Sequence, residues 1–149
     1  MYNLTKKARN VIFLTDNSGE IVFDTLLIKE LKNLGCNVTV AVKEGPVLND
    51  ATLVDAQFVG MDKIANLLIT TGADSVGLQL QDCSKEFLKI YYNTDFVIAK
   101  GMGYAETLTE MELKVQHGLL LRTKCEPIAR YFNVERNKNV SIILPRDKK

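Results

Sequence analysis

The feature that most constrains the fold is the pattern of the first third of the chain, where two apolar runs flank an amphipathic segment. The run NVIFLTD, residues 10–16, is apolar until its end, which is typical of a strand buried on both faces of a parallel sheet. Residues 20–35 place apolar side chains at helical spacing and close on glycine, a common helix end. The β-branched run at 36–43 predicts a second strand. Together these segments predict a βαβ unit.

The same alternation continues through the rest of the chain. The spacing predicts helices over residues 51–59, 61–72, 84–93 and 126–132, and strands over 95–101, 117–125 and 140–145. Residues 73–83 fit either a strand or a loop. We therefore expect a single α/β domain over residues 1–149, with a doubly wound, mostly parallel, Rossmann-like sheet in a three-layer α/β/α arrangement.

The composition fits a globular protein and narrows the classes of partner. Apolar residues make up 46% of the 149 residues, charged residues 25%, and the formal net charge is +1, with no basic block suited to nucleic acid. No apolar run approaches the roughly 20 residues that a membrane span needs, and the N-terminus lacks the apolar core of a signal peptide. The three cysteines are widely spaced, which argues against a disulfide framework or a zinc site. We expect a cytoplasmic protein with no nucleic-acid or membrane partner.

Polar residues collect where the predicted strands end, which is where open α/β sheets bind ligands. Oxygen-bearing side chains follow the first two strands, and lysines with glycines follow two later ones: Asp16, Asn17 and Glu20; Glu44, Asn49 and Asp50; Lys100, Gly101 and Gly103; Lys124. Carboxylates and amides suit Mg²⁺ or Mn²⁺, and a lysine is a compact donor for phosphate oxygens. The combination predicts a site that holds a divalent cation and handles a phosphoryl group.

Simpler interpretations of the same residues stay open at this point. Asp16, Asn17 and Asp50 are also ordinary turn and helix-capping residue types. The glycines after residue 100 also occur as plain loop residues. No GxGxxG or Walker sequence is present, which disfavours a dinucleotide or P-loop nucleotide site. With one histidine and no GxSxG sequence, a Ser-His-Asp hydrolase is disfavoured as well.

Four motifs of the chain resemble the damage-control phosphatase family, also known as domain of unknown function 89. They are TDNSGEIVFD (15–24), GPVLNDAT (45–52), AKGMGYAETL (99–108) and TKC (123–125), and the similarity runs from about Asn10 to Val140. The Lys-Cys pair resembles the mostly prokaryotic branch. The resemblance implies a metal-dependent phosphatase, active with Mn²⁺, Co²⁺, Ni²⁺ or Mg²⁺, that hydrolyses sugar phosphates or damaged and side-product phosphates.

Carried over motif by motif, the resemblance also implies roles for single residues. Asp16, Asn17 and Asp50 would coordinate the metal, with Asp16 and Asp50 as the catalytic carboxylates. The substrate would contact the remaining motif residues, which are Glu20, Lys100, Gly101, Met102, Gly103 and Lys124.

Two departures from the family pattern shape the remaining expectations. The third motif usually has Asn where this chain has Tyr104, and family members usually carry a helical segment before the α/β core. We therefore expect an apolar surface where such a segment would pack, with a homodimer or a separate helical partner chain. Two alternatives to the phosphatase are a non-catalytic or partner-dependent metal-binding module and an S-adenosylmethionine-dependent carboxyl methyltransferase. The methyltransferase ranks last because the glycine-rich loop usual after the first strand is missing.

Overall fold

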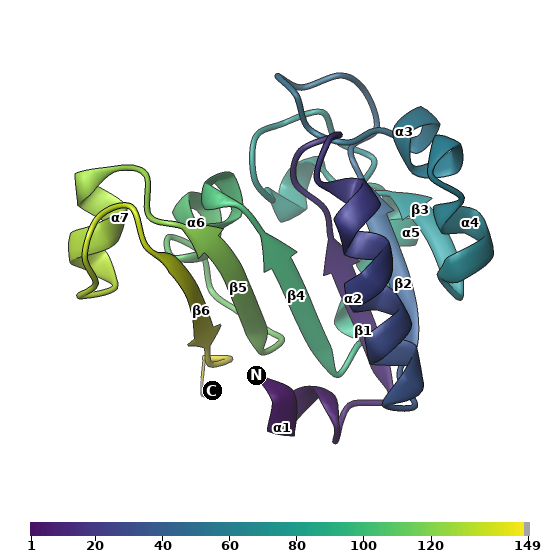
Figure 1. Cartoon of the computed structure of the whole chain (residues 1–149), viewed down its shortest axis with the longest axis horizontal. Helices are drawn as coiled ribbons and strands as arrows, with labels where there is room; N and C mark the ends of the chain where they lie inside the picture. The colour runs from purple at the N-terminus through teal and green to yellow at the C-terminus, as the bar shows by residue number, and fades with distance from the viewer. Residues whose placement is uncertain (148–149) are drawn as a thin grey trace.

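The computed structural model of the chain describes residues 1–147 and contains a six-stranded sheet with helices on both faces (Figure 1). The strand order is β3-β2-β1-β4-β5-β6, and all neighbours pair in parallel except β6, which runs antiparallel to β5. The strands are β1 (Asn10–Leu14), β2 (Asn37–Val42), β3 (Leu67–Thr70), β4 (Phe96–Lys100), β5 (His117–Arg122) and β6 (Asn139–Leu144). The chain builds outward from β1 to β3 and then returns to add β4, which confirms the doubly wound, mostly parallel sheet.

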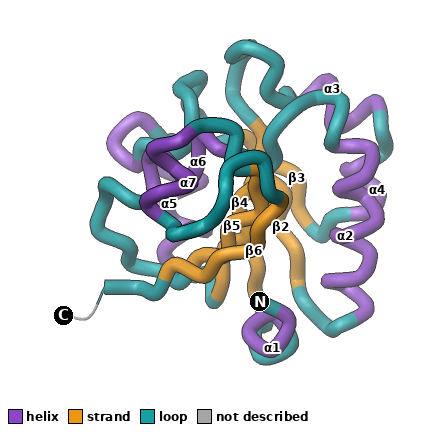
Figure 2. The backbone as a smooth tube through the Cα atoms, turned by 60° about the vertical axis from the view of Figure 1, so that its left-hand side comes forward, coloured by secondary structure: helices purple, strands orange, loops and turns teal. Residues whose placement is uncertain are grey.

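The helices form the outer two layers. They are α1 (Tyr2–Thr5), α2 (Ile21–Asn33), α3 (Leu53–Phe58), α4 (Met61–Ile64), α5 (Lys85–Tyr92), α6 (Met102–Leu108) and α7 (Glu126–Tyr131). Figure 2 shows the strands between two groups, with α2, α3 and α4 on one side and α5, α6 and α7 on the other. None of the helices that residues 1–147 form has the length and apolarity needed to cross a membrane.

Alternate residues of β1 enter different hydrophobic cores. Val11 and Phe13 pack with Ile28 of α2, whereas Ile12 and Leu14 pack on the other face with α5 and α6. All of these side chains are buried. The continuous apolar run of this strand is therefore explained by burial on both faces, as the sequence predicted. The expected domain extends to residue 149, and its last two positions lie outside the described residues.

The helix expected over residues 61–72 is wrong in its second half. The helix α4 ends at Ile64, and the chain then forms the edge strand β3. Asn66 explains the change, because its backbone N–H donates to Val38 O at 2.9 Å and its Oδ1 accepts from Val38 N at 3.0 Å. These two hydrogen bonds attach the chain to β2, so the residues after Asn66 form a strand although their apolar side chains have helical spacing.

Residues 73–83, which fit either a strand or a loop by sequence, form a loop with one 3₁₀ turn (Leu80–Asp82). The glycine-containing segment after β4 forms the helix α6, with Gly103 inside its first turn. A Cβ atom at Gly103 would press on Val76, so the missing side chain lets the loop approach the helix.

Candidate active site

The loops after β1 and β2 are joined by backbone hydrogen bonds at the carboxyl edge of the sheet. Ala51 donates its backbone N–H to the carbonyl oxygen of Asp16 at 2.8 Å. Beside this bond, Asn17 and Asp50 face each other as an isolated antiparallel β-bridge. Because β1 and β2 are parallel neighbours, both loops leave the sheet on the same side. The structure thus brings together Asp16, Asn17 and Asp50, the three residues expected to bind a cation.

The Asp16 carboxylate lies in a strongly negative and partly desolvated environment. Burial raises the pKa of Asp16 to about 6, and the negative charges of Glu20 and Asp50 add to the effect, while two nearby lysines only partly offset it. Asn17 Nδ2 donates to Asp16 Oδ2 at 3.0 Å. A desolvated carboxylate beside other acids is the environment that a bound cation relieves.

The oxygen donors fit a hard divalent cation. Asp16 and Asp50 supply carboxylates, and the Asn17 amide nitrogen donates to Asp16 and to Glu20, which leaves the Asn17 carbonyl oxygen for a cation. Within residues 1–147, no group of three or more His, Cys, Asp or Glu side chains is arranged to hold a metal ion. A cation here would therefore depend on the Asn17 oxygen and on water or substrate oxygens. Mg²⁺ sites with one or two carboxylates and a substrate phosphate have this character.

The turn between β4 and α6 packs directly on Asp16. Gly101 has a φ of 92°, and a Cβ atom at this position would overlap the Asp16 carboxylate. A side chain is therefore excluded by the backbone conformation and by the space. Gly101 was expected as a substrate contact, and in the structure it makes room for Asp16. Gly103 was expected beside it, but Gly103 packs on Val76 and Gly77 and does not line the cavity described below.

Lys100, at the end of β4, is bonded to two carboxylates of the protein. Its ammonium donates to Glu20 Oε2 at 2.7 Å and to Asp24 Oδ1 at 2.6 Å. Burial disfavours the charge, but the hydrogen bonds to Asp24 and Glu20 outweigh burial and raise the pKa of Lys100. Lys100 was expected to hold phosphate. In the structure its charge is neutralised, and it fixes Glu20 against the cavity.

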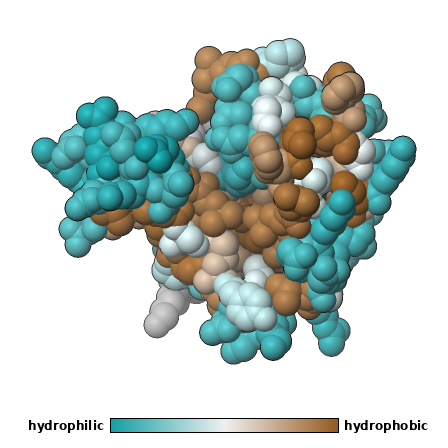
Figure 3. Space-filling view, in the orientation of Figure 1, coloured by the Kyte–Doolittle hydropathy of each residue, from teal (hydrophilic) through white to brown (hydrophobic). Residues whose placement is uncertain are grey.

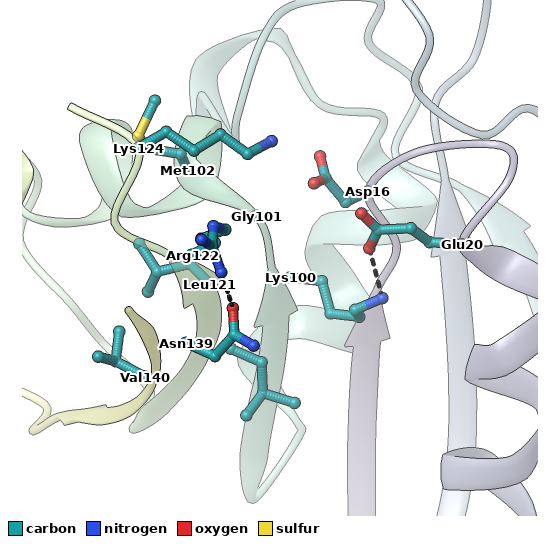
Figure 4. Close-up of a pocket in the computed structure, with 11 residues that line it drawn as sticks. Asp16, Glu20, Lys100, Gly101, Met102, Leu121, Arg122, Lys124, Asn139 and Val140 are labelled. Atoms are coloured by element: carbon teal, nitrogen blue, oxygen red, sulfur yellow. Dashed lines mark hydrogen bonds and ion pairs between the residues drawn. The ribbon is translucent and has the colours of Figure 1, made fainter. Parts of the chain in front are cut away.

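A cavity of about 400 Å³ opens beside Asp16 (Figure 4). Asp16 and Glu20 lie on one side of it, and Arg122 and Lys124, from β5 and the loop that follows, lie on the other. The remaining lining residues are Lys100, Gly101, Met102, Leu120, Leu121, Asn139 and Val140. An acidic side opposite a basic side can hold a cation and an anionic substrate next to each other.

Sequence analysis missed two polar residues of this cavity. Arg122 lies two positions before Lys124, and alternate residues of an extended strand point the same way, so strand periodicity was the available signal. Asn139 accepts a hydrogen bond from Arg122 Nη1 at 3.4 Å. Its place depends on the antiparallel pairing of β6 with β5, which no local pattern reveals.

Lys43, after β2, is a third residue that sequence analysis missed. It is 2% exposed, and its Nζ lies 3.7 Å from Asp50 Oδ2. The ammonium donates to the carbonyl oxygens of Ser75 and Gly77 at 2.8 and 2.5 Å. Burial lowers the pKa of Lys43, and Asp50 opposes that shift. Lys43 is the last residue of an otherwise apolar run. A charged residue at the end of a buried strand is the signal that could have identified it.

Most of the chain is similar to one protein family. The profile of the damage-control phosphatase ARMT1-like domain matches residues 1–140. A protein named damage-control phosphatase from Archaeoglobus fulgidus is 42% identical over 124 residues, which cover 83% of this chain and 43% of the relative. A damage-control phosphatase from Pyrococcus horikoshii is 38% identical over 135 residues, which cover 90% of this chain and 46% of the relative.

A solved structure shows the same fold. The crystal structure of a DUF89 family protein from Pyrococcus horikoshii matches with a TM-score of 0.85 at 36% identity, over 93% of this chain and 48% of that one. This similarity confirms the three-layer α/β architecture. The chain spans somewhat less than half the length of the curated relatives it matches.

Proposed function

The chain belongs to the damage-control phosphatase ARMT1-like family, and on this basis we propose that it is a metal-dependent phosphatase of small phosphorylated metabolites. The observation that carries the proposal is the meeting of the loops that hold Asp16, Asn17 and Asp50 at one edge of the sheet. Of these three residues, Asp16 lines the cavity, whose other side is basic. The names of the relatives support the same activity. The cation would be Mn²⁺, Co²⁺, Ni²⁺ or Mg²⁺.

We assign a task to each group of residues around the cavity. Asp16, Asn17 and Asp50 would hold the cation, which would supply charge neutralisation for phosphoryl oxygens and lower the pKa of water. Arg122 and Lys124 bind the anionic substrate from the opposite side and orient it toward the acidic edge. Glu20, held by Lys100, would accept a hydrogen bond from a hydroxyl group of the substrate.

The size of the cavity favours a small substrate. Its volume of about 400 Å³ is at the low end of the roughly 300–1,000 Å³ that ligand sites commonly have. A sugar phosphate, or a damaged or side-product phosphate of similar size, fits this volume. We also place the protein in the cytoplasm, where its three free cysteines stay reduced.

The test is a phosphate-release screen over sugar phosphates with Mn²⁺, Co²⁺, Ni²⁺ and Mg²⁺ in turn. Asp16→Asn removes one carboxylate ligand and should lower phosphate release by about 100-fold or more. Asp62→Asn, on an exposed position of α4, makes the same chemical change away from the cavity and should leave the rate unchanged. Equal rates for the parent protein and Asp16→Asn would refute the proposed role of this carboxylate.

A second candidate, a partner-dependent metal-binding module, is favoured by an exposed apolar surface on α2 and α3. Phe23 of α2 is 72% exposed and Phe58 of α3 is 91% exposed. Leu26, Leu48 and Val54 are also exposed, and Figure 3 shows apolar residues gathered over α2 and toward α3. We propose that this α2–α3 surface packs against a helical partner segment equivalent to the part of the relatives that this chain does not match. A second copy of the chain is the competing occupant.

A further inference from the structure

One buried hydroxyl group beside the candidate cation site has no partner. Within residues 1–147, three buried side-chain nitrogen or oxygen atoms lack a hydrogen bond: Asp24 Oδ2, Ser75 Oγ and Tyr104 Oη. Asp24 already bonds Lys100 through its other oxygen. Tyr104 has its single polar atom unsatisfied in a side chain that is 2% exposed. Such a group normally destabilises a protein, so its presence needs an explanation.

The surroundings of Tyr104 point to the cation site. Its ring packs in the core cluster of α5 and α6, and Lys43 Nζ lies over the ring, 4.8 Å from the centroid. Burial and the negative charges of Asp50 and Asp16 raise the pKa of Tyr104, so the phenol keeps its proton and stays a hydrogen-bond donor. Lys43 connects the ring to the candidate cation site, because its Nζ also lies 3.7 Å from Asp50 Oδ2.

Asp50, which also contacts Lys43, is under-bonded. The contact between Asp50 Oδ2 and Lys43 Nζ is 3.7 Å, which is longer than a hydrogen bond, and no closer donor bonds this carboxylate within the described residues. The ring that carries the orphaned donor and the under-bonded carboxylate therefore contact the same ammonium. Because the Tyr104 hydroxyl is sealed from solvent, its partner must be a group already inside the protein.

We propose that Tyr104 is a positioning residue for the cation site, whose hydroxyl donates to a carboxylate oxygen of the Asp16–Asp50 pair when a divalent cation is bound. The inference rests on the proposed function for the cation itself. A hydrogen bond from a hydroxyl to a carboxylate is short and charge-assisted, so it fixes the orientation of the acceptor. Without the cation the hydroxyl has no hydrogen-bond partner, and the folded protein is less stable than it would be with Phe at this position.

Tyr104→Phe tests this inference because it removes the hydroxyl and little else. Two measurements are needed: the thermal midpoint of the metal-free protein, and the Kd for Mn²⁺ by isothermal titration calorimetry. We expect a midpoint that is unchanged or raised, together with Mn²⁺ binding that is weaker by about tenfold. A merely structural hydroxyl would not give this combination.

Tyr91→Phe is the matched control. Tyr91 is also fully buried, but its hydroxyl contacts His117 Nε2 at 3.2 Å. This variant should lower the thermal midpoint and leave Mn²⁺ binding unchanged. The inference is overturned if Tyr104→Phe binds Mn²⁺ as tightly as the parent protein, or if it lowers the midpoint as Tyr91→Phe does. A parent protein that binds no Mn²⁺ would refute both the cation site and the inference. A parent protein that binds Mn²⁺ no better than Tyr104→Phe would refute the inference alone, so the two failures are distinguishable.

Discussion

Lys100 and Lys124 line the same cavity but differ in their partners, so their replacement by Met should have different effects. Lys124 forms no ion pair within residues 1–147, and Lys124→Met should weaken substrate binding by about tenfold without changing stability. Lys100→Met leaves the buried carboxylate of Asp24 without its partner. We expect the free energy of unfolding to fall by about 3 kcal/mol, measured by urea denaturation. Equal effects of the two substitutions on KM and stability would contradict this distinction.

His117 makes the stability of the fold depend on pH. Burial lowers the pKa of His117 from 6.5 to about 4. Its Nδ1 lies 2.8 Å from Val115 O and its Nε2 contacts Tyr91, so the neutral ring is well bonded. The unfolded chain takes up a proton near pH 6.5, whereas the folded protein does so only near pH 4. The stabilisation is therefore complete above pH 6.5 and is lost as the pH falls toward 4, by about 3 kcal/mol.

The difference between His117→Gln and the parent protein isolates this contribution, because the carboxylates titrate in both. Urea denaturation at pH 7, 5.5 and 4.5 should show a shallower decline for the variant. An unchanged pH dependence would mean that His117 is not the group responsible.

At the scale of elements, the turn from β4 into α6 controls the position of Asp16. Gly101→Ala would place a methyl group on the Asp16 carboxylate and strain a backbone with a φ of 92°. We expect Mn²⁺ affinity to fall by at least tenfold and the free energy of unfolding by about 1–3 kcal/mol. Gly35→Ala is the matched control, since its φ is 89° but no atom lies within 4 Å of its Cβ position. Gly35→Ala should lower the free energy of unfolding and leave the affinity for Mn²⁺ unchanged. An equal loss of Mn²⁺ affinity in both variants would contradict the proposed role of Gly101.

The elements that the sequence predicted correctly are those whose pattern is local. The β1–α2–β2 unit follows from two apolar runs and one amphipathic segment, and the position of Asp16 and Asp50 at the same edge of the sheet follows from their places after strands. The strand β3 was missed because Asn66 pairs with Val38, far away in the sequence. The helical spacing of apolar residues carries no information about such a long-range hydrogen bond.

The roles that sequence analysis missed depend on the assembled fold. Lys43 lies in contact with both Asp50 and the ring of Tyr104. Tyr104 stood out as a departure from the third motif, but Lys43 is far from it in the sequence, so no local pattern shows their contact. Burial converts an ordinary lysine and an ordinary tyrosine into a buried ion pair and an orphaned donor. Asn139 reaches the cavity only through strand pairing. The sequence shows the chemical type of such residues, but only the strand topology shows which of them lie close together.

At the scale of the whole molecule, the α2–α3 surface predicts association. Phe23 and Phe58 are largely exposed, and contiguous apolar patches of this kind usually mark interfaces. The proposed helical partner implies that the isolated chain is a monomer whose exposed apolar side chains bind an apolar dye. Sedimentation velocity should show one species, and Phe23→Ser with Phe58→Ser should reduce dye binding. A concentration-dependent dimer that these substitutions abolish would show that a second copy covers the surface instead.

We propose that Asp16, Asn17 and Asp50 hold one divalent cation at the carboxyl edge of the sheet, and a crystal structure of the protein soaked with Mn²⁺ would show the ion and its ligands. Anomalous scattering locates the ion independently of any assumption about its ligands. We predict one strong peak between the loops after β1 and β2, with oxygens of all three residues at about 2.0–2.3 Å. No peak at this edge, or a peak bound by other residues while Asp50 still faces Lys43, would contradict the account.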